Sequence, residues 1–209
     1  MAVAELELIA AEVSSCQKCP LAKGRVKAVP GEGPADARVM LIGEGPGFHE
    51  NQQGRPFVGP SGQFLSELLA MAGLKREEVF ITNVVKCRPP GNRDPQPEEI
   101  AACSDYLSRQ TALIRPRIVM TLGRYSLSRF LPAARISAVH GRPHKIGAVT
   151  VFPMYHPAAA LHQPTLRKTL LDDMAKLPDI LAELEQRAPE RAPVVAEPPP
   201  EPPKQLSLF

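Results

Sequence analysis

The chain has 209 residues, of which 44% are hydrophobic and 22% are charged, and its formal net charge is +3. This length and composition support one substantial hydrophobic core. No stretch reaches the roughly 18 apolar residues that a membrane-spanning helix needs, and the first residues lack the cationic segment and apolar block of a secretion signal. We therefore expect a soluble, cytoplasmic, monomeric protein with one domain (residues 1–187) and a tail.

The charged residues are distributed unevenly along the chain. Between Asp105 and Asp172 there is no acidic residue, whereas this interval contains ten Lys or Arg residues and four of the five His residues. A surface with charges of one sign attracts polyanions, so the pattern favours a nucleic acid partner. The alternative is a chance fluctuation that is spread around the globule.

The first part of the chain alternates between helical and strand patterns. Residues 2–13 and 61–73 have apolar side chains at helical spacing. Residues 38–43 are a compact apolar run bounded by turn residues, which is typical of a strand buried on both faces of a parallel sheet, and residues 79–85 are expected to form a second buried strand. The Gly-rich segment 43–47 is expected to form a turn at the carboxyl end of the first strand.

The second part repeats this alternation. Residues 97–113 predict a helix, residues 117–123 and 148–155 predict strands, and residues 165–187 predict a long helix with a kink at Pro178. The predicted fold class is α/β, a three-layer α/β/α sandwich with a central, mainly parallel four-stranded sheet. Ligands in such folds collect at the carboxyl ends of the strands.

The tail differs in composition from the domain. From Pro189 to Pro203, seven of fifteen residues are proline, so residues 188–203 are expected to be a disordered, extended linker. Residues 204–209 are abruptly apolar. The pentapeptide that starts with Gln205 and ends with Phe209 resembles the peptide by which bacterial repair and replication proteins bind the sliding clamp. An inert C-terminus is the alternative, but the position after a linker favours clamp binding.

Four cysteines suggest a metal centre. Two residues separate Cys16 from Cys19, so both sulfurs can face one centre from a single loop, whereas Cys87 follows a strand and Cys103 lies in a helix. Disulfides are not expected in a cytoplasmic chain, and a dithiol redox site would not require the two distant cysteines. The spacing alone leaves zinc and an iron–sulfur cluster equally open.

Four motifs accompany these cysteines, and each alone is weak. They are Gly43-Glu44-Gly45-Pro46-Gly47, Gly54-Arg55-Pro56-Phe57-Val58-Gly59, Thr82-Asn83-Val84-Val85-Lys86-Cys87-Arg88-Pro89-Pro90 and His156-Pro157-Ala158-Ala159-Ala160-Leu161. In this order and spacing, from about residue 5 to about residue 185, the chain resembles the iron–sulfur (family 4) uracil-DNA glycosylases of bacterial type.

The resemblance implies a cofactor and an activity. The cofactor is a [4Fe–4S] cluster on Cys16, Cys19, Cys87 and Cys103, which clamps loops near the DNA surface because hydrolysis needs no electron. The activity belongs to base excision repair: uracil is flipped out of double- or single-stranded DNA, and its N-glycosidic bond is hydrolysed to leave an abasic site. Residues 88–93 lack the Arg-rich, His-containing insertion of a subclass that becomes covalently trapped on DNA, so we expect a monofunctional hydrolase that turns over.

The resemblance also assigns residues that hold the base. Phe57 matches the aromatic residue that stacks on the flipped base, and Asn83 matches the amide that contacts both N3–H and O4 of uracil. Cytosine presents the reverse donor and acceptor at these positions, so an amide in a fixed orientation rejects it. Taken in isolation, Phe57 would be read as a core residue and Asn83 as a turn residue.

Further residues are assigned to the chemistry of bond cleavage. His156 matches the residue that donates a hydrogen bond to uracil O2 as negative charge develops there. Glu44 is expected to orient or deprotonate the attacking water. The backbone around Gly43 and Gly45 is expected to contact the base, and Glu50 corresponds to a position that crowds C5 and would collide with the methyl group of thymine.

The sequence also offers candidates for the surface that contacts DNA. Leu161 is the candidate wedge that fills the gap left by the flipped base, although packing beneath its own loop is an equally open alternative. The candidate phosphate contacts are Lys86, Arg88, Arg124, Arg142 and Lys145, although a surface arginine is usually only solvated.

Two other functions compete with uracil excision. A non-catalytic iron–sulfur or zinc DNA-binding module would keep the basic stretch and the cysteines but lose Asn83 or His156, and both are present. A related enzyme with another base preference, such as hypoxanthine or mismatched thymine, would differ only in the details of its pocket.

Overall fold

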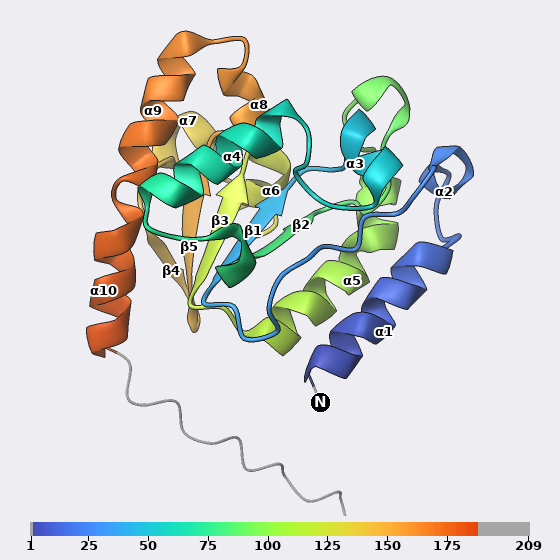
Figure 1. The fold of residues 1–209 in the computed structure, drawn as a ribbon, viewed down its shortest axis with the longest axis horizontal. Coiled ribbons are helices and arrows are strands. Elements are labelled where there is room, and N and C mark those ends of the chain that lie inside the picture. Colours follow the sequence, from blue (N-terminus) through green and yellow to red (C-terminus); the bar gives the residue numbers. More distant parts are fainter. Residues whose placement is uncertain (1, 188–209) are drawn as a thin grey trace, which may run out of the picture.

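Five strands form one sheet in the computed structural model, which describes residues 2–187 (Figure 1). In order across the sheet, the strands are β2 (Phe80–Asn83), β1 (Val39–Gly43), β3 (Ile118–Leu122), β5 (Val149–Met154) and β4 (His144–Ile146). The first four are mutually parallel, whereas β4 runs antiparallel to β5. The prediction of an α/β fold around a mainly parallel sheet is therefore confirmed.

The predicted number of strands was wrong, because the sequence indicated four and β4 is the fifth. This strand has three residues at the edge of the sheet, and its Lys145 pairs with Thr150 of β5. Gly147 closes the turn between the two strands with a φ of 58°. Three residues are too few for an alternation of apolar and polar side chains to be recognised in a sequence.

The side chains of the parallel strands alternate between two cores. In β1, Val39 and Leu41 belong to one core, and Met40 and Ile42 belong to the other. Because successive side chains of a strand point to opposite faces, a strand that is covered on both faces is apolar at most positions. This explains the apolar run of β1 in the sequence.

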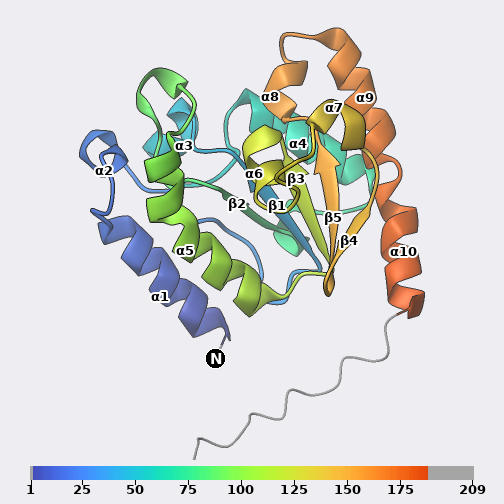
Figure 2. The same ribbon diagram turned by 180° about the vertical axis from the view of Figure 1, so that it is seen from behind.

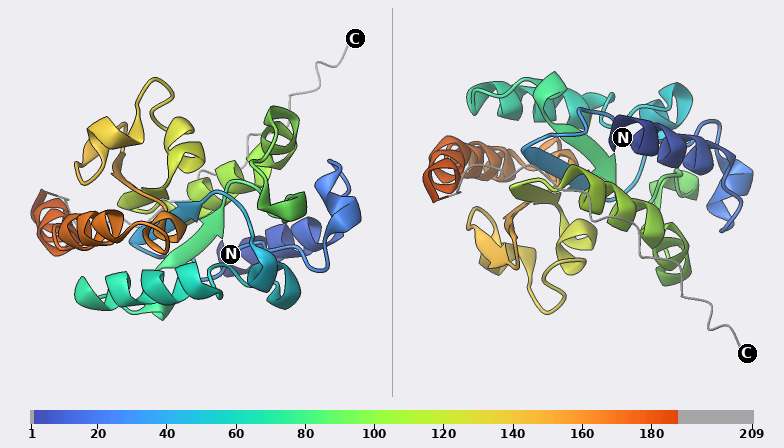
Figure 3. Two further views of the ribbon diagram at one scale, coloured as in Figure 1. Left: turned by 90° about the horizontal axis from the view of Figure 1, so that it is seen from above. Right: turned by 90° about the horizontal axis from the view of Figure 1, so that it is seen from below.

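Helices cover both faces of the sheet and give the predicted three layers (Figures 2 and 3). The first core lies under α4 (Pro60–Met71), α8 (Pro157–Ala160), α9 (Pro164–Met174) and α10 (Leu177–Arg187). The second core lies under α1 (Ala2–Ser15) and α5 (Pro97–Ile114), which pack against each other. The other described helical segments are short: α2 (Leu21–Gly24), α3 (Phe48–Gln53), α6 (Arg124–Ser128), α7 (Ile136–Val139), and the 3-10 turns η1 (Arg76–Glu78) and η2 (Pro90–Asn92).

The long helix predicted at residues 165–187 is two helices. α9 ends at Met174, and α10 begins at Leu177. Pro178 has no N–H to donate, and its ring would collide with the carbonyl group of Met174 in a continuous helix. The proline therefore produces a break rather than the predicted kink.

Two predictions concern residues outside the described part of the chain, namely the linker at 188–203 and the clamp-binding peptide at 204–209. Within residues 2–187, no helix combines the length and the apolar character that crossing a membrane would require.

Candidate active site

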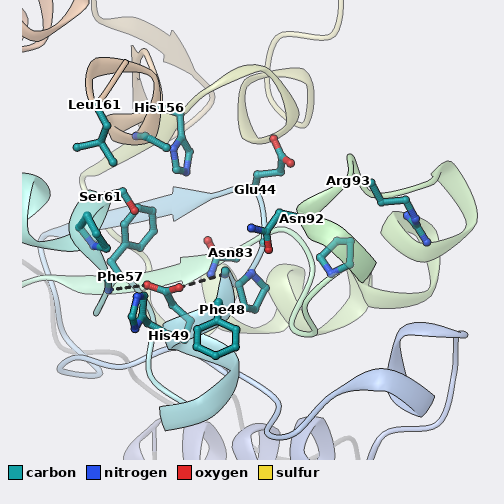
Figure 4. Close-up of a pocket in the computed structure, with 18 residues that line it drawn as sticks. Glu44, Phe48, His49, Phe57, Ser61, Asn83, Asn92, Arg93, His156 and Leu161 are labelled. Atoms are coloured by element: carbon teal, nitrogen blue, oxygen red, sulfur yellow. Dashed lines mark hydrogen bonds between the residues drawn. The ribbon is translucent and has the colours of Figure 1, made fainter. Parts of the chain in front are cut away.

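A pocket opens at the carboxyl ends of the parallel strands (Figure 4). Its volume is about 370 Å³, which is in the usual range for a site that binds a small ligand. Seven of the residues predicted for the site line it: Glu44, Gly45, Glu50, Phe57, Asn83, His156 and Leu161. They come from segments that are far apart in sequence but follow β1, β2 and β5.

Gly43 makes room for two of the pocket side chains. It ends β1 and lies beside Asn83, which ends β2. A Cβ atom at position 43 would be 2.4 Å from Oδ1 of Asn83 and 2.7 Å from Cζ of Phe57. Any side chain at this position would therefore displace both residues, so Gly43 acts through the space it leaves.

Gly45 also allows close packing. A Cβ atom at this position would be 2.7 Å from Cγ2 of Val85, in the segment that follows β2. The N–H of Val85 donates to the carbonyl oxygen of Glu44 over 3.1 Å. The glycine thus brings the turn after β1 against the segment after β2.

Asn83 presents a buried acceptor without a partner. Its side chain is 1% exposed, and Oδ1 accepts no hydrogen bond from the described residues. An unsatisfied buried acceptor costs about 1–3 kcal/mol, so a ligand that brings an N–H to this oxygen gains affinity by satisfying it. The amide also carries N–H donors, so one side chain can offer both kinds of hydrogen bond.

Phe57 is held in an unusual backbone conformation. Its φ is +50°, a left-handed value that favours glycine. Nη1 of Arg76 donates to the carbonyl oxygen of Phe57 over 3.0 Å, and Nη2 of Arg76 donates to that of Pro56 and to the Glu32 carboxylate. These contacts fix the loop that aims the Phe57 ring into the pocket.

The rings of Phe57 and His156 are stacked. Their centroids are 5.6 Å apart, and their planes differ by 26°. A base inserted between two parallel rings would need about 7 Å, twice the usual contact distance of roughly 3.5 Å. A flipped base therefore has to stack on Phe57 without passing between these two rings.

His156 is fixed as a hydrogen-bond donor. It caps α8, and its Nδ1 accepts a hydrogen bond from the main-chain N–H of Ala158 over 3.1 Å. Burial lowers the pKa of His156 to about 4, although the nearby Glu50 carboxylate raises it. At neutral pH the ring is therefore uncharged, its proton is on Nε2, and it can stabilise a developing oxyanion without transferring a proton.

Glu44 has the properties of a general base. Burial raises the pKa of its carboxyl group above the ordinary value, and the negative charge of Asp94 raises it further. The positive charge of Arg124 acts in the opposite direction. A partly desolvated carboxylate at the pocket wall is suited to orient or deprotonate a water molecule.

Glu50 braces two loops of the pocket. Its Oε1 accepts hydrogen bonds from the N–H groups of Val58 at 2.8 Å and Gly59 at 2.9 Å, and its Oε2 accepts one from Gly47 at 3.1 Å. Glu50 is 7% exposed and lines the pocket. Its predicted contact with C5 of a bound base stays a prediction, and the bracing role was not foreseen.

Leu161 lies at the rim of the pocket and is 44% exposed. It follows α8, and the exposed fraction of its side chain leaves it accessible from the pocket mouth. Its role as a wedge stays a prediction.

The prediction that Lys86 contacts phosphate was wrong. Its side chain is 1% exposed, and Nζ donates to Oγ1 of Thr82 at 2.5 Å, Oε1 of Gln110 at 2.7 Å and the carbonyl oxygen of Asn83 at 3.0 Å. These three acceptors use all three protons of the ammonium group. Burial lowers the pKa of Lys86 to about 7. Lys86 therefore supports the segment behind Asn83 and cannot reach DNA.

The other predicted phosphate contacts occupy different places. Arg88 does not line the pocket but contacts a residue that does. Its Nε donates to Oδ1 of Asn92 over 2.7 Å. Arg124 is exposed and forms an ion pair with Asp94. Arg142 is exposed, beyond the pocket lining.

Lys145, another predicted phosphate contact, lies away from the pocket, and its contact with DNA stays a prediction. It pairs with Thr150 at the start of β5, which places it near the amino ends of the parallel strands. The pocket lies at their carboxyl ends. The sequence could not reveal this, because the turn that joins β4 to β5 was not recognised.

Sequence reasoning missed several residues that line the pocket. They are Phe48, His49, Ser61, Asn92 and Arg93, with the prolines Pro46, Pro60 and Pro89. Asn92 has a φ of 55°, a value that asparagine adopts more readily than most residues. The Pro-Gly-Asn sequence at positions 90–92 was the one available signal of this turn.

The four cysteines surround one small cavity. Cys87 and Cys103 are buried, Cys16 and Cys19 are half-buried, and all four line the same small cavity of about 10 Å³. Among residues 2–187, no three Cys, His, Asp or Glu side chains are placed so that they could hold a metal ion. Four cysteine thiolates can hold either a zinc ion or an iron–sulfur cluster.

Three N–H groups point at these sulfurs. Nη1 of Arg25 lies 3.4 Å from Sγ of Cys87, the N–H of Lys86 lies 3.3 Å from Sγ of Cys103, and the N–H of Lys18 lies 3.5 Å from Sγ of Cys16. Such donors stabilise thiolates, which are the form in which cysteine binds metal.

Comparisons with known proteins show which family the chain belongs to. The family model of the Uracil DNA glycosylase superfamily matches residues 30–177. The chain is 50% identical to a type-4 uracil-DNA glycosylase of Saccharolobus solfataricus over 187 residues, which cover 85% of this chain and 87% of the relative. For the type-4 enzyme of Thermotoga maritima, the identity is 43% over 176 residues, which cover 82% of this chain and 92% of the relative.

The chain thus belongs to the uracil-DNA glycosylase superfamily. Within this superfamily, the chain belongs to the type-4 uracil-DNA glycosylases, the family that its motifs resemble.

Proposed function

We propose that this protein is a uracil-DNA glycosylase that flips uracil out of DNA and hydrolyses its N-glycosidic bond, leaving free uracil and an abasic site. The observation that carries the proposal is the pairing of two fixed groups in one pocket. One is the unpartnered acceptor Oδ1 of Asn83, and the other is the Nε2–H donor of His156.

The two groups match the polar atoms of uracil. Oδ1 of Asn83 accepts a hydrogen bond from N3–H, and the amide N–H of the same residue donates to O4. Cytosine has a lone pair at N3 and an amino group at position 4, so both contacts would become repulsive. Thymine differs from uracil only by its C5 methyl group, which Glu50 excludes in this proposal.

Cleavage separates charge across the glycosidic bond. Negative charge develops on the departing uracil, and Nε2–H of His156 stabilises it at O2 without transferring a proton. Positive charge develops on the deoxyribose. Glu44 orients the water that attacks this sugar, and it accepts the proton as the new C–O bond forms.

The substrate assignment is tested with labelled oligonucleotides that contain uracil, hypoxanthine or mismatched thymine, followed by alkaline cleavage of abasic sites. Product from uracil alone is expected. Asn83→Ala and His156→Ala should each lower the rate of uracil excision by about a hundredfold or more. Gln63→Ala removes an exposed amide outside the pocket and should not change the rate. Absence of product from uracil would refute the proposed function.

We also propose that Cys16, Cys19, Cys87 and Cys103 hold a [4Fe–4S] cluster. The cavity they share and the N–H donors aimed at three of their sulfurs support it. When bound, the cluster would supply a rigid cross-link between the loop at residues 16–19, the segment after β2 and α5. Purified protein should contain iron and absorb near about 400 nm, and Cys103→Ser should lose both properties. Zinc in place of iron would contradict the assignment.

For the last five residues we propose binding to the sliding clamp, on the basis of the sequence from Gln205 to Phe209 alone. Deletion of residues 205–209 should abolish affinity for the clamp and leave excision from short oligonucleotides unchanged, because the pocket is formed by residues 44–161. Unchanged clamp affinity would end the idea.

A further inference from the structure

One exposed aromatic side chain at the pocket has no part in the chemistry described above. Phe48 is the first residue of α3 and lines the pocket, yet it is 53% exposed. The ring of His49 meets it edge-on, with centroids 5.5 Å apart and an angle of 85° between the planes. A large apolar side chain left in water at the mouth of a binding site is typical of a recognition surface.

A cation lies over this ring. Cζ of Arg88 is 5.3 Å from the ring centroid of Phe48, within the range of a cation–π contact. Nε of Arg88 donates to Oδ1 of Asn92 over 2.7 Å, and Asn92 also lines the pocket. The arginine is therefore anchored on one side and keeps its remaining donors available.

Phe48 and Leu161 stand at different edges of the pocket mouth (Figure 4). Leu161 is the predicted wedge that replaces the flipped base. If one strand of DNA crosses the mouth with its uracil inserted, a nucleotide next to the uracil passes over the edge that Phe48 and Arg88 form. An aromatic face beside a positive charge is the combination that binds unpaired nucleotides, since every base has a π-face and every linkage has a charge.

We propose that Phe48 and Arg88 form a subsite for the nucleotide that neighbours the excised uracil. The base of that nucleotide stacks on the face of the Phe48 ring that Arg88 does not cover, and its phosphate pairs with Arg88. The subsite favours single-stranded DNA, because in a duplex the neighbouring base keeps its own partner and its own stack. This inference rests on the proposed function and extends it to the strand around the uracil.

The test uses short single-stranded oligonucleotides with one central uracil on a 2′-fluorinated sugar, which resists hydrolysis. Three versions carry both neighbouring bases, no base on the 5′ side or no base on the 3′ side. Dissociation constants are measured by fluorescence anisotropy for the purified protein with its cofactor. Removal of one particular neighbouring base should weaken binding by about tenfold, and removal of the other should have a smaller effect.

The same measurements on Phe48→Ala give a double-mutant cycle. The variant should bind the complete oligonucleotide about tenfold more weakly and should no longer respond to loss of the neighbouring base. Phe48→Trp keeps an aromatic face and should retain the response. Leu8→Ala, which truncates an exposed apolar side chain on α1 away from the pocket, should match the unmodified protein.

Arg88→Gln removes one phosphate contact in this proposal. The slope of the logarithm of the binding constant against the logarithm of the salt concentration should therefore become smaller by about one. The subsite is refuted if Phe48→Ala binds the complete oligonucleotide normally, or if it still responds to the missing base as the unmodified protein does. Failure of the proposed function would be seen separately, as absence of excision from an ordinary uracil oligonucleotide by the unmodified protein.

Discussion

The main-chain N–H of Ala158 donates a hydrogen bond to Nδ1 of His156 over 3.1 Å, and this contact decides what the histidine can do. An imidazole that accepts at Nδ1 carries its single proton on Nε2, which faces the pocket as a donor. The contact exists only while the ring is neutral, because a protonated ring has no lone pair left at Nδ1. The main chain thus selects a tautomer before any substrate binds.

The low pKa of His156 predicts a pH-dependent stability. The ordinary value is 6.5, and the folded protein holds the pKa at about 4. As the pH falls from about 6.5 toward 4, the unfolded chain takes up a proton that the folded protein does not, so the free energy of unfolding decreases. Urea denaturation at pH 7 and pH 5 should show this loss. His156→Gln should lose less stability over the same interval, whereas His162→Gln, which changes an exposed histidine, should behave like the unmodified protein.

The raised pKa of Glu44 predicts the acidic limb of the rate profile. A base must be deprotonated to act, so the rate of excision should rise with pH as Glu44 ionises, at a pH above the ordinary value of 4.5. Glu44→Gln should remove this limb and lower the rate by about a hundredfold or more. Single-turnover rates between pH 4 and pH 8 would measure both effects.

The two charges near Glu44 provide matched controls with opposite signs. Asp94→Asn removes a negative charge that raises the pKa, so the acidic limb should move to lower pH. Arg124→Gln removes a positive charge that lowers it, and the limb should move to higher pH. If both variants moved the limb in the same direction, or neither moved it, another group would control the profile.

Because the amine of Lys86 is buried, replacing this residue should lower the stability of the protein without removing a phosphate contact. Lys86→Met removes three hydrogen bonds and leaves Oε1 of Gln110 without its 2.7 Å donor, which should lower the free energy of unfolding by about 2–4 kcal/mol. The dependence of DNA binding on salt should not change. Lys75→Met, at an exposed position, should leave stability unaffected. A smaller salt dependence in Lys86→Met would restore the idea of a phosphate contact.

Much of the fold could be predicted because the parallel strands are covered on both faces. Burial on both faces makes β1 a continuous apolar run and leaves β3 and β5 apolar apart from Thr121 and Thr150, and such runs are visible in a sequence. β4 has no such covering, and its three residues left no pattern. The break before Pro178 was only partly foreseen, because a proline can bend a helix or end it and the choice depends on tertiary packing.

The pocket was predicted from motifs, and its supporting contacts were not. Asn83 and His156 belong to short motifs, whereas Arg76 lies 19 residues beyond Phe57, whose carbonyl group it binds. Long-range side-chain contacts to the main chain leave no local signature. Lys86 shows the opposite error, since a lysine in a motif suggests an exposed charge and only the fold reveals the three acceptors around its amine.

Arg76 is expected to act on excision through Phe57. Without the donors of Arg76, nothing in the described contacts holds the carbonyl group of Phe57, and its left-handed backbone (φ +50°) should relax. Arg76→Ala should therefore lower kcat/KM for uracil excision by about ten- to a hundredfold, because a displaced stacking ring misplaces the base. Arg55→Ala is the matched control: Arg55 also pairs with Glu32, with Nε 2.8 Å from Oε2, but its side chain makes no hydrogen bond to the Phe57 loop. In a Phe57→Ala background, Arg76→Ala should cause little additional loss of kcat/KM, and a full additional loss there would show that Arg76 acts by another route.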